Sequence, residues 1–296
     1  MRQLMILLFC CWASPAGAAL LIYDGFDYAG GPPLNGQTNL QYGETWAYAG
    51  AGQNAPTVGH VGFSVPGLKP PAPLSKSVTY DFTKNGTARL DIPGGAINSG
   101  TVYWSGILHV TNVSAIISAS TTGGGGIMLG GFNNSTGAQA TVPTTFAGIF
   151  AITRNSADSN QYFIGAAVNN GSRVWATGAP QNSGDTAFVV VSYTFNTGST
   201  TDDEMKLWVN PDPDDFGAAV APAHTIQGGT TAGADYGQMA SFVLRNVPSV
   251  GGPMVWFDEL RIGDDWASVT VPEPSTCGLL LIGGVLMVSR RRFVRR

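Results

Sequence analysis

The chain has 296 residues and a formal net charge of −4, and only 11% of its residues are charged, against about 25% in an average soluble domain. Its apolar content of 44% and aromatic content of 10% are enough to bury a core, which excludes an intrinsically disordered chain. The acidic balance offers nucleic-acid phosphates no basic surface, and three cysteines in so long a chain exclude a disulfide scaffold.

Residues 1–18 have the pattern of a secretory signal peptide. Arg2 is followed by the apolar run Leu4–Trp12 and then by small residues that end in an A-x-A cleavage pattern. We therefore expect the Sec translocon and signal peptidase as partners, with cleavage after Ala18 or Ala19. The alternative is a buried N-terminal strand or helix, which is disfavoured because the run is not amphipathic.

Residues 19–270 form the predicted body, in which short β-type runs are separated by Gly, Asn, Ser, Thr and Pro. These runs are rich in β-branched and aromatic residues and too short for helices of comparable burial, so the prediction is an all-β fold, a jelly-roll sandwich of two antiparallel sheets. The strands are expected at Ser77–Thr83, Ala88–Ile92, Val102–Val110, Gly126–Gly131, Phe146–Thr153, Gln161–Val168, Ala187–Phe195, Met205–Val209, Met239–Asn246 and Val255–Gly263.

The segment from Gly25 to Pro73 differs from the rest of the body because prolines interrupt it repeatedly. It is predicted to be loop-like, either as a peripheral strand-and-loop wrap or as a small separate region. Its apolar periodicity is too weak for independent folding, so a single domain is the simpler interpretation.

Two boundary segments of the body carry a family resemblance. The opening stretch Tyr23–Tyr28 reads YDGFDY, and the closing stretch Trp256–Gly263 reads WFDELRIG and is followed by Trp266–Val269. Together with Leu207–Pro211, this pairing resembles the concanavalin A-like (laminin-G-like) jelly rolls of bacterial surface proteins. The resemblance implies that the first and last strands pair in one sheet.

A glycosidase on such a fold would need two carboxylates flanking the scissile bond. The laminarinase-type motif E-x-D-x-x-E is absent, because none of the three Glu before the C-terminal segment (Glu44, Glu204 and Glu259) begins it. Asp258 and Glu259 are adjacent, so on a regular strand they point to opposite faces. We expect one of them to face solvent on a closing strand, and we expect no catalytic residues in the body.

A transition-metal site is not indicated, since the body has no cysteine and its histidines lack ligand spacing: His60, His109 and His224. Calcium prefers several oxygen ligands from one loop. Asp212, Asp214 and Asp215 therefore form a Ca²⁺ hypothesis, although a solvated acidic turn is the preferred interpretation because six oxygen ligands are not identifiable there. Asp202–Glu204 has the same ambiguity and is expected at a hairpin tip.

Aromatic rings could stack on sugars. Trp104, Trp175 and Trp208 are the candidates for glycan stacking, beside Trp46 and Tyr48. Because Trp is highly buried on average, we expect these rings to belong to the core or to half-buried strand positions instead.

Residues 271–296 combine three features in order: the motif Pro272-Glu273-Pro274, an apolar helix predicted over 275–289, and a basic tail over 290–296. The helix is shorter than the roughly 20 residues that span a bilayer comfortably, so it crosses only a thinned membrane. The tail stays on the cytoplasmic side by the positive-inside rule. Its basic residues are Arg290, Arg291, Arg292, Arg295 and Arg296.

This tripartite order resembles the PEP-CTERM protein-sorting signal of Gram-negative bacteria. The resemblance implies recognition by an exosortase, a membrane transpeptidase-like enzyme, with cleavage near the motif. It also implies an exported protein that is anchored in the inner membrane as a precursor and then reaches the cell surface or the medium, in bacteria that make extracellular polysaccharide. The alternative is an uncleaved single-span anchor.

Without the two ends the body and motif have nine basic residues against 19 acidic, a net charge of −10, and the body has no cysteine. An exported body without disulfides depends on core burial for its stability. The sequence therefore predicts a non-catalytic surface or matrix protein, with binding of extracellular polysaccharide as one option. The alternatives are a secreted glycosidase or lyase on the same fold, and a structural spacer without a ligand.

Overall fold

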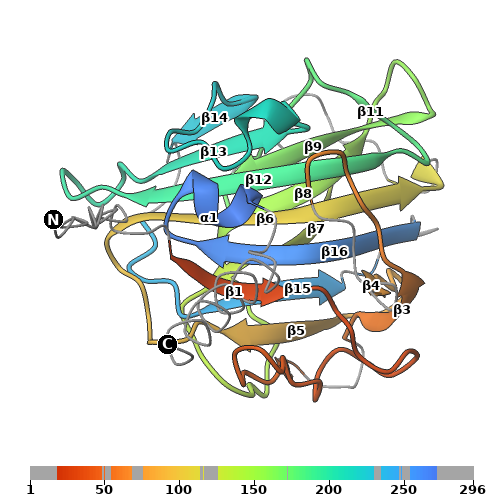
Figure 1. Cartoon of the computed structure of the whole chain (residues 1–296), viewed down its shortest axis with the longest axis horizontal. Coiled ribbons are helices and arrows are strands. Elements are labelled where there is room, and N and C mark those ends of the chain that lie inside the picture. The colour runs from red at the N-terminus through yellow and green to blue at the C-terminus, as the bar shows by residue number, and fades with distance from the viewer. Residues whose placement is uncertain are drawn as a thin grey trace, which may run out of the picture.

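The computed structural model describes residues 19–271 apart from 49, 51–54, 69–75, 114–115, 117–125, 172, 230–234, 247 and 249–253. Two eight-stranded antiparallel sheets face one another (Figure 1). In the described part of the chain the α-helical structure is limited to α1 (Trp266–Thr270). The predicted all-β sandwich is therefore confirmed.

The front sheet, nearer the viewer in Figure 1, has the strand order β14-β13-β12-β6-β16-β4-β3, and β1 also pairs with β16. Its strands are β1 (Leu20–Asp24), β3 (Thr57–Val61), β4 (Lys76–Thr79), β6 (Gly100–Thr111), β12 (Thr186–Phe195), β13 (Glu204–Val209), β14 (Ile226–Gly229) and β16 (Met254–Gly263).

The rear sheet has the order β10-β9-β8-β7-β15-β5-β2, and β11 pairs with β9. Its strands are β2 (Ala47–Tyr48), β5 (Gly86–Asp91), β7 (Ile127–Asn133), β8 (Ala147–Arg154), β9 (Gln161–Ala167), β10 (Val174–Trp175), β11 (Gln181–Asn182) and β15 (Ser241–Asn246). Each of the ten predicted strands overlaps a strand of one of the two sheets.

Strand β6 shows how the sequence pattern produces the two layers. Val102, Trp104 and Leu108 belong to the main core between the sheets, whereas Tyr103 and Ile107 belong to a second cluster on the outer face. Successive side chains of a strand point to opposite faces, so one alternating run supplies both clusters. The long strand predicted here is confirmed, and all of β12 pairs along it.

Aromatic rings fill the centre of the main core. The ring of Trp104 lies 4.7 Å from Phe150, 5.4 Å from Phe242 and 6.3 Å from Phe257, measured between centroids, and all four side chains are at most 1% exposed. Full burial of each such side chain contributes about 1.5–3 kcal/mol. This packing supplies the stability that the predicted body must find without disulfides.

The two ends of the body meet along β16. Strand β1 pairs antiparallel with its C-terminal half, from Leu20 opposite Gly263 to Asp24 opposite Leu260. Strand β4 pairs with the N-terminal half at Trp256–Phe257, so β1 and β4 share one edge of β16. The pairing of first and last strands expected from the resemblance is therefore confirmed.

The outer face of the front sheet is largely covered by the chain's own segments. Trp208 of β13 packs with Trp266 and Val269 of α1, at a Trp–Trp centroid distance of 5.2 Å. Part-buried residues of two loops, from Phe63 to Val65 and from Phe216 to Ala221, close over the same cluster. Figure 1 shows α1 lying in front of this sheet.

The segment from Gly25 to Pro73 contributes an edge strand to each sheet. Strand β2 pairs with β5 of the rear sheet, and β3 pairs with β4 of the front sheet. Of the two predicted alternatives, this arrangement matches the peripheral wrap. The sequence did not predict either strand, because both are short and lie among prolines and glycines.

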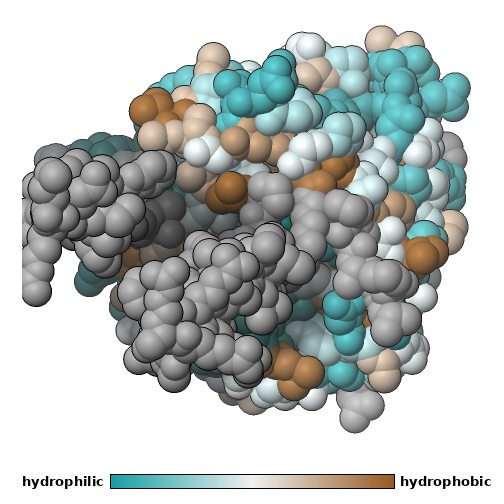
Figure 2. Space-filling view, viewed as in Figure 1, coloured by the Kyte–Doolittle hydropathy of each residue, from teal (hydrophilic) through white to brown (hydrophobic). Residues whose placement is uncertain are grey.

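The visible described surface mixes hydrophilic and hydrophobic residues (Figure 2). Within the described ranges no helix has the length and apolar content that crossing a membrane requires. The predicted signal peptide (1–18), the sorting motif and the predicted membrane helix and tail (272–296) lie outside the described residues.

Candidate functional site

A pocket of about 480 Å³ opens where β1 ends and the following loop begins. This volume lies within the range of small-molecule sites, about 300–1,000 Å³. Its walls come from the end of β1 and from one loop, with these residues: Tyr23, Asp24, Gly25, Asp27, Tyr28, Ala29, Gln37, Thr38, Asn39, Leu40 and Gln41.

Asp24 fixes the loop that forms the pocket. Its Oδ1 accepts a hydrogen bond from the Phe26 amide at 2.8 Å, and its Oδ2 accepts from the Tyr28 hydroxyl at 2.6 Å and from Trp46 Nε1 at 2.7 Å. The turn places Phe26 at φ 54°, in the left-handed region. Burial raises the pKa of Asp24, and these donors oppose that rise.

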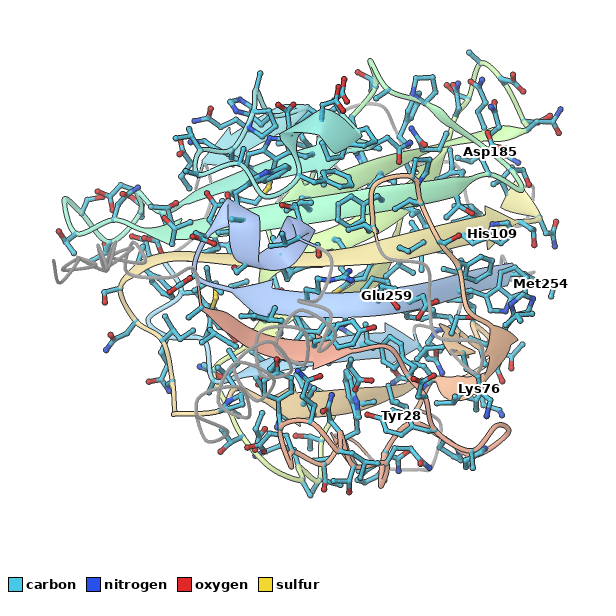
Figure 3. The ribbon with its side chains drawn as sticks, viewed as in Figure 1. Tyr28, Lys76, His109, Asp185, Met254 and Glu259 are labelled. Carbon is cyan, nitrogen blue, oxygen red and sulfur yellow. The ribbon has the colours of Figure 1, made fainter. Side chains whose placement is uncertain are left out.

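Two further contacts brace the loop against the front sheet. Asn39 donates from Nδ2 to the Tyr23 carbonyl at 2.6 Å, and its Oδ1 accepts from the amides of Gln41 and Tyr42 at 3.0 and 3.1 Å. Lys76 donates from Nζ to the Tyr28 carbonyl at 2.6 Å, and Figure 3 shows these two residues side by side. The pocket is thus held in shape by the protein itself.

A buried ion pair lies under the pocket. Arg261 Nη2 and Glu259 Oε2 are 2.7 Å apart, and the two side chains are 1% and 2% exposed. The Tyr23 hydroxyl donates to Glu259 Oε1 at 3.0 Å, and the Arg261 guanidinium lies 5.1 Å from the centre of the Tyr23 ring. Removing one partner of such a pair leaves an uncompensated buried charge, which costs about 3–5 kcal/mol.

The prediction that Asp258 or Glu259 faces solvent is wrong, because both are buried, at 0% and 2% exposure. The strand alternation behind that prediction fails here. The pairing of β16 with β6 shifts register between Asp258 and Arg261, and Glu259 has φ 56°. A bulge of this kind turns a side chain away from the face that simple alternation assigns to it.

Asp258 is held by backbone donors. Its Oδ2 accepts from the Phe63 amide at 2.7 Å and its Oδ1 from the Glu259 amide at 2.8 Å. Burial raises the pKa of Asp258 to about 8, with smaller contributions from the charges of Glu259 and Asp27, while the two backbone donors oppose the rise. The carboxyl group ties the loop at Phe63 to the bulge and has no exposed surface to offer a substrate.

Two polar side chains of the pocket remain uncommitted within the described part of the chain. Asp27 is exposed and lies near enough to Lys76 to feel its charge, but accepts no hydrogen bond from a described residue. The side-chain amide of Gln37 likewise makes no hydrogen bond with a described residue. Beside the half-buried rings of Tyr23 and Tyr28, these groups can bind hydroxyl groups of a ligand.

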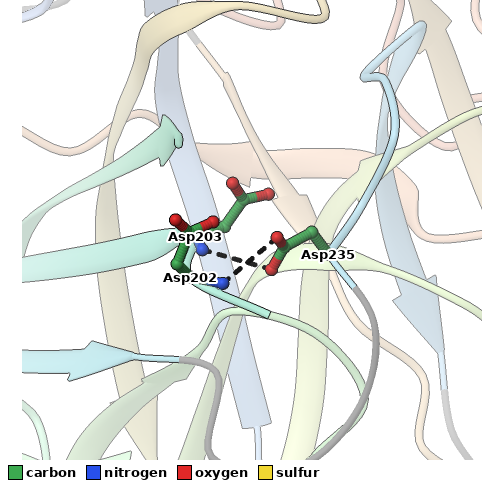
Figure 4. A group of neighbouring side chains, drawn as sticks. All are labelled: Asp202, Asp203 and Asp235. Atoms are coloured by element: carbon green, nitrogen blue, oxygen red, sulfur yellow. Dashed lines mark hydrogen bonds between the residues drawn. The ribbon is translucent and has the colours of Figure 1, made fainter. Parts of the chain in front are cut away.

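A second group of acidic residues lies at the β12–β13 hairpin. Asp202, Asp203 and Asp235 each place an oxygen within 4.8 Å of the others (Figure 4). Asp235 accepts from the amides of Asp202 and Asp203 at 3.1 Å each, and Asp203 accepts from Asn196 at 2.7 Å and from the Tyr193 hydroxyl. Burial raises the pKa of Asp203. The carboxylates mainly bind their own backbone, and three are fewer than the six to eight oxygens that Ca²⁺ takes.

The predicted Ca²⁺ ligands are not brought together. Among the described residues Asp212, Asp214 and Asp215 form no cluster of converging carboxylates. Asp212 instead caps a short 3-10 helix (Pro213–Asp215), where its Oδ1 accepts from the Asp214 amide at 3.0 Å. Asp212 and Asp214 are exposed, so the segment matches the solvated acidic turn that the sequence favoured.

The three tryptophans considered for glycan stacking are buried, so the stacking hypothesis is wrong for them. Trp104 is 0% exposed in the main core, and Trp208 is 2% exposed against α1. Trp175 is 6% exposed because its ring covers Gly165, where an added Cβ would come within 2.3 Å of it. Their rings serve packing, as the favoured interpretation of the sequence predicted.

The sequence missed an aromatic stack at one end of the front sheet. Phe63 lies between His60 and His109, with centroid distances of 5.2 and 4.7 Å and interplanar angles of 7° and 19°. Trp256 lies 4.7 Å from His60 and 5.4 Å from His109.

Burial, followed by the charge of His60, lowers the pKa of His109. Figure 3 shows His109 near Asp185, at the same end as Met254. The rings of the stack pack against one another. Because they come from three chain segments that are distant in sequence, the sequence could not predict the stack.

Comparison with known families identifies the C-terminal segment. Residues 270–296 match the model of the PEP-CTERM protein-sorting motif. The chain is therefore a jelly-roll sandwich that ends in a PEP-CTERM motif. Such a motif marks an exported protein that an exosortase sorts toward the surface of a Gram-negative bacterium. Among curated proteins none matches this chain.

Several solved structures are similar over most of the body. A mutant of alginate lyase Aly36B in complex with alginate trisaccharide has 10% identity and a TM-score of 0.44, covering 83% of this chain and 96% of that one. Domain 4 of AbnA, a GH43 extracellular arabinanase from Geobacillus stearothermophilus, in complex with arabinotriose, has 16% identity, a TM-score of 0.41, and coverages of 86% and 97%. The binding domain of botulinum neurotoxin serotype D has 9% identity and a TM-score of 0.42, covering 79% of this chain and 47% of that one. These likenesses are remote, and the fold above rests on this chain's own strand order.

The raised pKa of Asp258 predicts a pH dependence of stability. The folded state holds a proton on this group up to about pH 8, while the unfolded chain releases it near 3.8. The stability that this proton contributes is fully present below the pKa of the unfolded chain and is lost as the pH rises through the pKa of the folded state. Between pH 7 and pH 9 we expect the free energy of unfolding to fall by about 1.4 kcal/mol from this group.

Urea unfolding followed by tryptophan fluorescence at the two pH values measures this change. Asp258→Asn should flatten the dependence, whereas Asp214→Asn, at an exposed turn residue, should leave it unchanged. Equal or greater stability of the wild type at pH 9 would contradict the assignment.

Proposed function

We propose that this chain is a non-catalytic surface or extracellular-matrix protein that binds polysaccharide in the pocket at the end of β1. The sorting motif directs the protein to the cell surface, and the sandwich body provides the binding surface. The observation that carries the binding proposal is the pre-formed pocket with uncommitted Asp27 and Gln37 beside two tyrosines.

The route of export follows from the two ends of the chain. Residues 1–18 act as a signal peptide that the Sec translocon and signal peptidase process. The short helix at 275–289 then holds the precursor in the inner membrane, with the arginines of 290–296 on the cytoplasmic side, until the exosortase cleaves near Pro272–Pro274. A body without cysteine needs no disulfide formation after export.

The chemistry of the pocket favours a hydroxyl-rich neutral glycan. A carboxylate and an amide together accept from and donate to neighbouring hydroxyl groups, and tyrosine rings offer apolar faces to the carbon skeleton of a sugar. The exposed Asp27 carboxylate and the net charge of −10 for body and motif repel a polyanionic chain. We therefore assign the pocket to neutral polysaccharide rather than to a polyuronate.

The placement of the buried carboxylates supports a non-catalytic body. Asp24 and Asp258 accept hydrogen bonds from protein donors on both carboxyl oxygens. Glu259 is paired with Arg261 and Tyr23. A general acid or nucleophile must reach the scissile bond, and these groups instead hold the loop, the bulge and the sheet together.

The sorting part of the proposal predicts the fate of tail variants. Glu273→Gln, or deletion of residues 290–296, should leave unprocessed protein in the inner membrane, because the exosortase loses its motif or the helix loses its cytoplasmic anchor. Membrane fractionation and mass spectrometry of the C-terminus measure this, with Glu44→Gln as the control. Normal processing and release of both tail variants would overturn the sorting assignment.

The binding part predicts weaker glycan binding by pocket variants. Asp27→Ala and Gln37→Ala should each raise the Kd for a neutral polysaccharide about tenfold, since each removes hydrogen bonds worth about 1.4 kcal/mol. Asp214→Ala, at an exposed turn outside the pocket lining, should bind as the wild type does.

A glycan array of neutral and uronate oligosaccharides, probed with the full-length protein in detergent, identifies the ligand before the Kd measurements. Absence of binding to every glycan at high protein concentration would count for a structural spacer and against the pocket. Preferential binding to uronates would overturn the charge argument, and release of cleaved products would overturn the non-catalytic assignment.

A further inference from the structure

The backbone at the start of the described chain is held by the residue that follows β16. The amide nitrogen of Ala19 lies 2.8 Å from Oδ1 of Asp264. In return, the Asp264 amide donates to the Ala19 carbonyl at 3.3 Å. Strand pairing begins at the next residue, with Leu20 opposite Gly263. Ala19 is therefore already part of the junction between the first and last strands.

The same residue follows a cleavage pattern in the sequence. Residues 16–18 read Ala-Gly-Ala, and signal peptidase cuts after the second small residue of an A-x-A pattern. Sequence alone leaves cleavage after Ala18 or after Ala19 open. The two products differ in whether the body keeps the residue that Asp264 holds.

We propose that signal peptidase cleaves the Ala18–Ala19 bond and that the new α-ammonium group of Ala19 forms an ion pair with Asp264. Hydrolysis adds one water, leaving a carboxylate on Ala18 and an amine on Ala19 that binds a proton near neutral pH. The donor to the Asp264 carboxylate thereby changes from a neutral amide to a cation, so that both partners of the hydrogen bond carry a charge. This inference rests on the proposed export route.

Cleavage one residue later would discard the contact. Leu20 would become the N-terminus, and both hydrogen bonds between Ala19 and Asp264 would disappear. The start of β1 would then be held by the pairing of Leu20 with Gly263, where the register is already irregular. The ion pair thus adds a contact at the start of β1, where the strand register is irregular.

The position of Asp264 links the two processed ends of the body. Asp265 directly follows it and caps α1 by accepting from the Ser268 amide at 2.8 Å. Helix α1 is fixed by the Ser105 hydroxyl, which donates to the Val269 carbonyl at 2.6 Å, and Val271 ends the described chain. Both signals therefore leave the body near the end of β16, and Asp264 marks the mature start once the first signal is removed.

N-terminal sequencing of the exported protein tests the cleavage site. The expected first residue is Ala19. A start at Leu20 or elsewhere would overturn this inference and leave the export route intact. An uncleaved chain that begins at Met1 would overturn the signal-peptide assignment, and with it both the export route and this inference.

The reactivity of the N-terminal amine tests the ion pair. An amine-selective acylating reagent reacts only with the unprotonated amine, and pairing with a carboxylate favours the protonated form. In the mature full-length protein at neutral pH, Asp264→Asn should react about threefold faster or more than the wild type, equivalent to about half a pKa unit.

Asn keeps an acceptor oxygen for Ala19 but carries no charge, so a contact that is merely structural would leave the rate unchanged. Asp158→Asn is the matched control, because it removes one exposed carboxylate from the turn between β8 and β9 in the other sheet. A second variant, Asp264→Ser, should behave as Asp264→Asn does. Equal rates in the wild type and both Asp264 variants would overturn the ion pair.

Discussion

The pairing of β1 with the end of β16 is the contact on which the rest of this structure depends. It joins strands more than 200 residues apart, and closing so long a loop costs entropy that only packing can offset. A body without cysteine has no covalent bond for this purpose. Ile22 of β1 and Ile262 of β16 are both 0% exposed in the main core. Their burial, with the strand pairing around them, closes the sandwich.

The bulge in β16 lies beside the pairing of β1 and helps to form the pocket. It lies where β1 leaves the edge of β16 and β4 takes over. There Asp258 turns inward to hold the Phe63 loop, and Glu259 pairs with Arg261 beneath Tyr23. The loop after β1 is then free to leave the sheet and form the pocket. Buried charges stabilise little by themselves, but they are costly to disrupt, and that makes this geometry specific.

The sequence predicted most strands of the two sheets, because segments such as Val102–Val110 can be recognised by their alternation and β-branched composition. It predicted the closure of the ends through the two boundary segments. It failed at Asp258 and Glu259, since one left-handed residue breaks the alternation on which their placement depended. It also missed the pocket, whose residues are polar loop residues organised by Asp24, and the ring stack around Phe63, which is a product of tertiary contacts.

Hydrogen–deuterium exchange of the full-length protein tests the closure most directly. If β1 is an integral strand, its amides between Ile22 and Asp24 should exchange as slowly as those of the central strand β6, through opening of the whole sandwich. Exchange of the β1 amides as fast as that of the exposed turn at Asp212–Asp214, with β6 still protected, would show that the first strand detaches independently. The account of the closure, the pocket and the mature N-terminus would then be contradicted together.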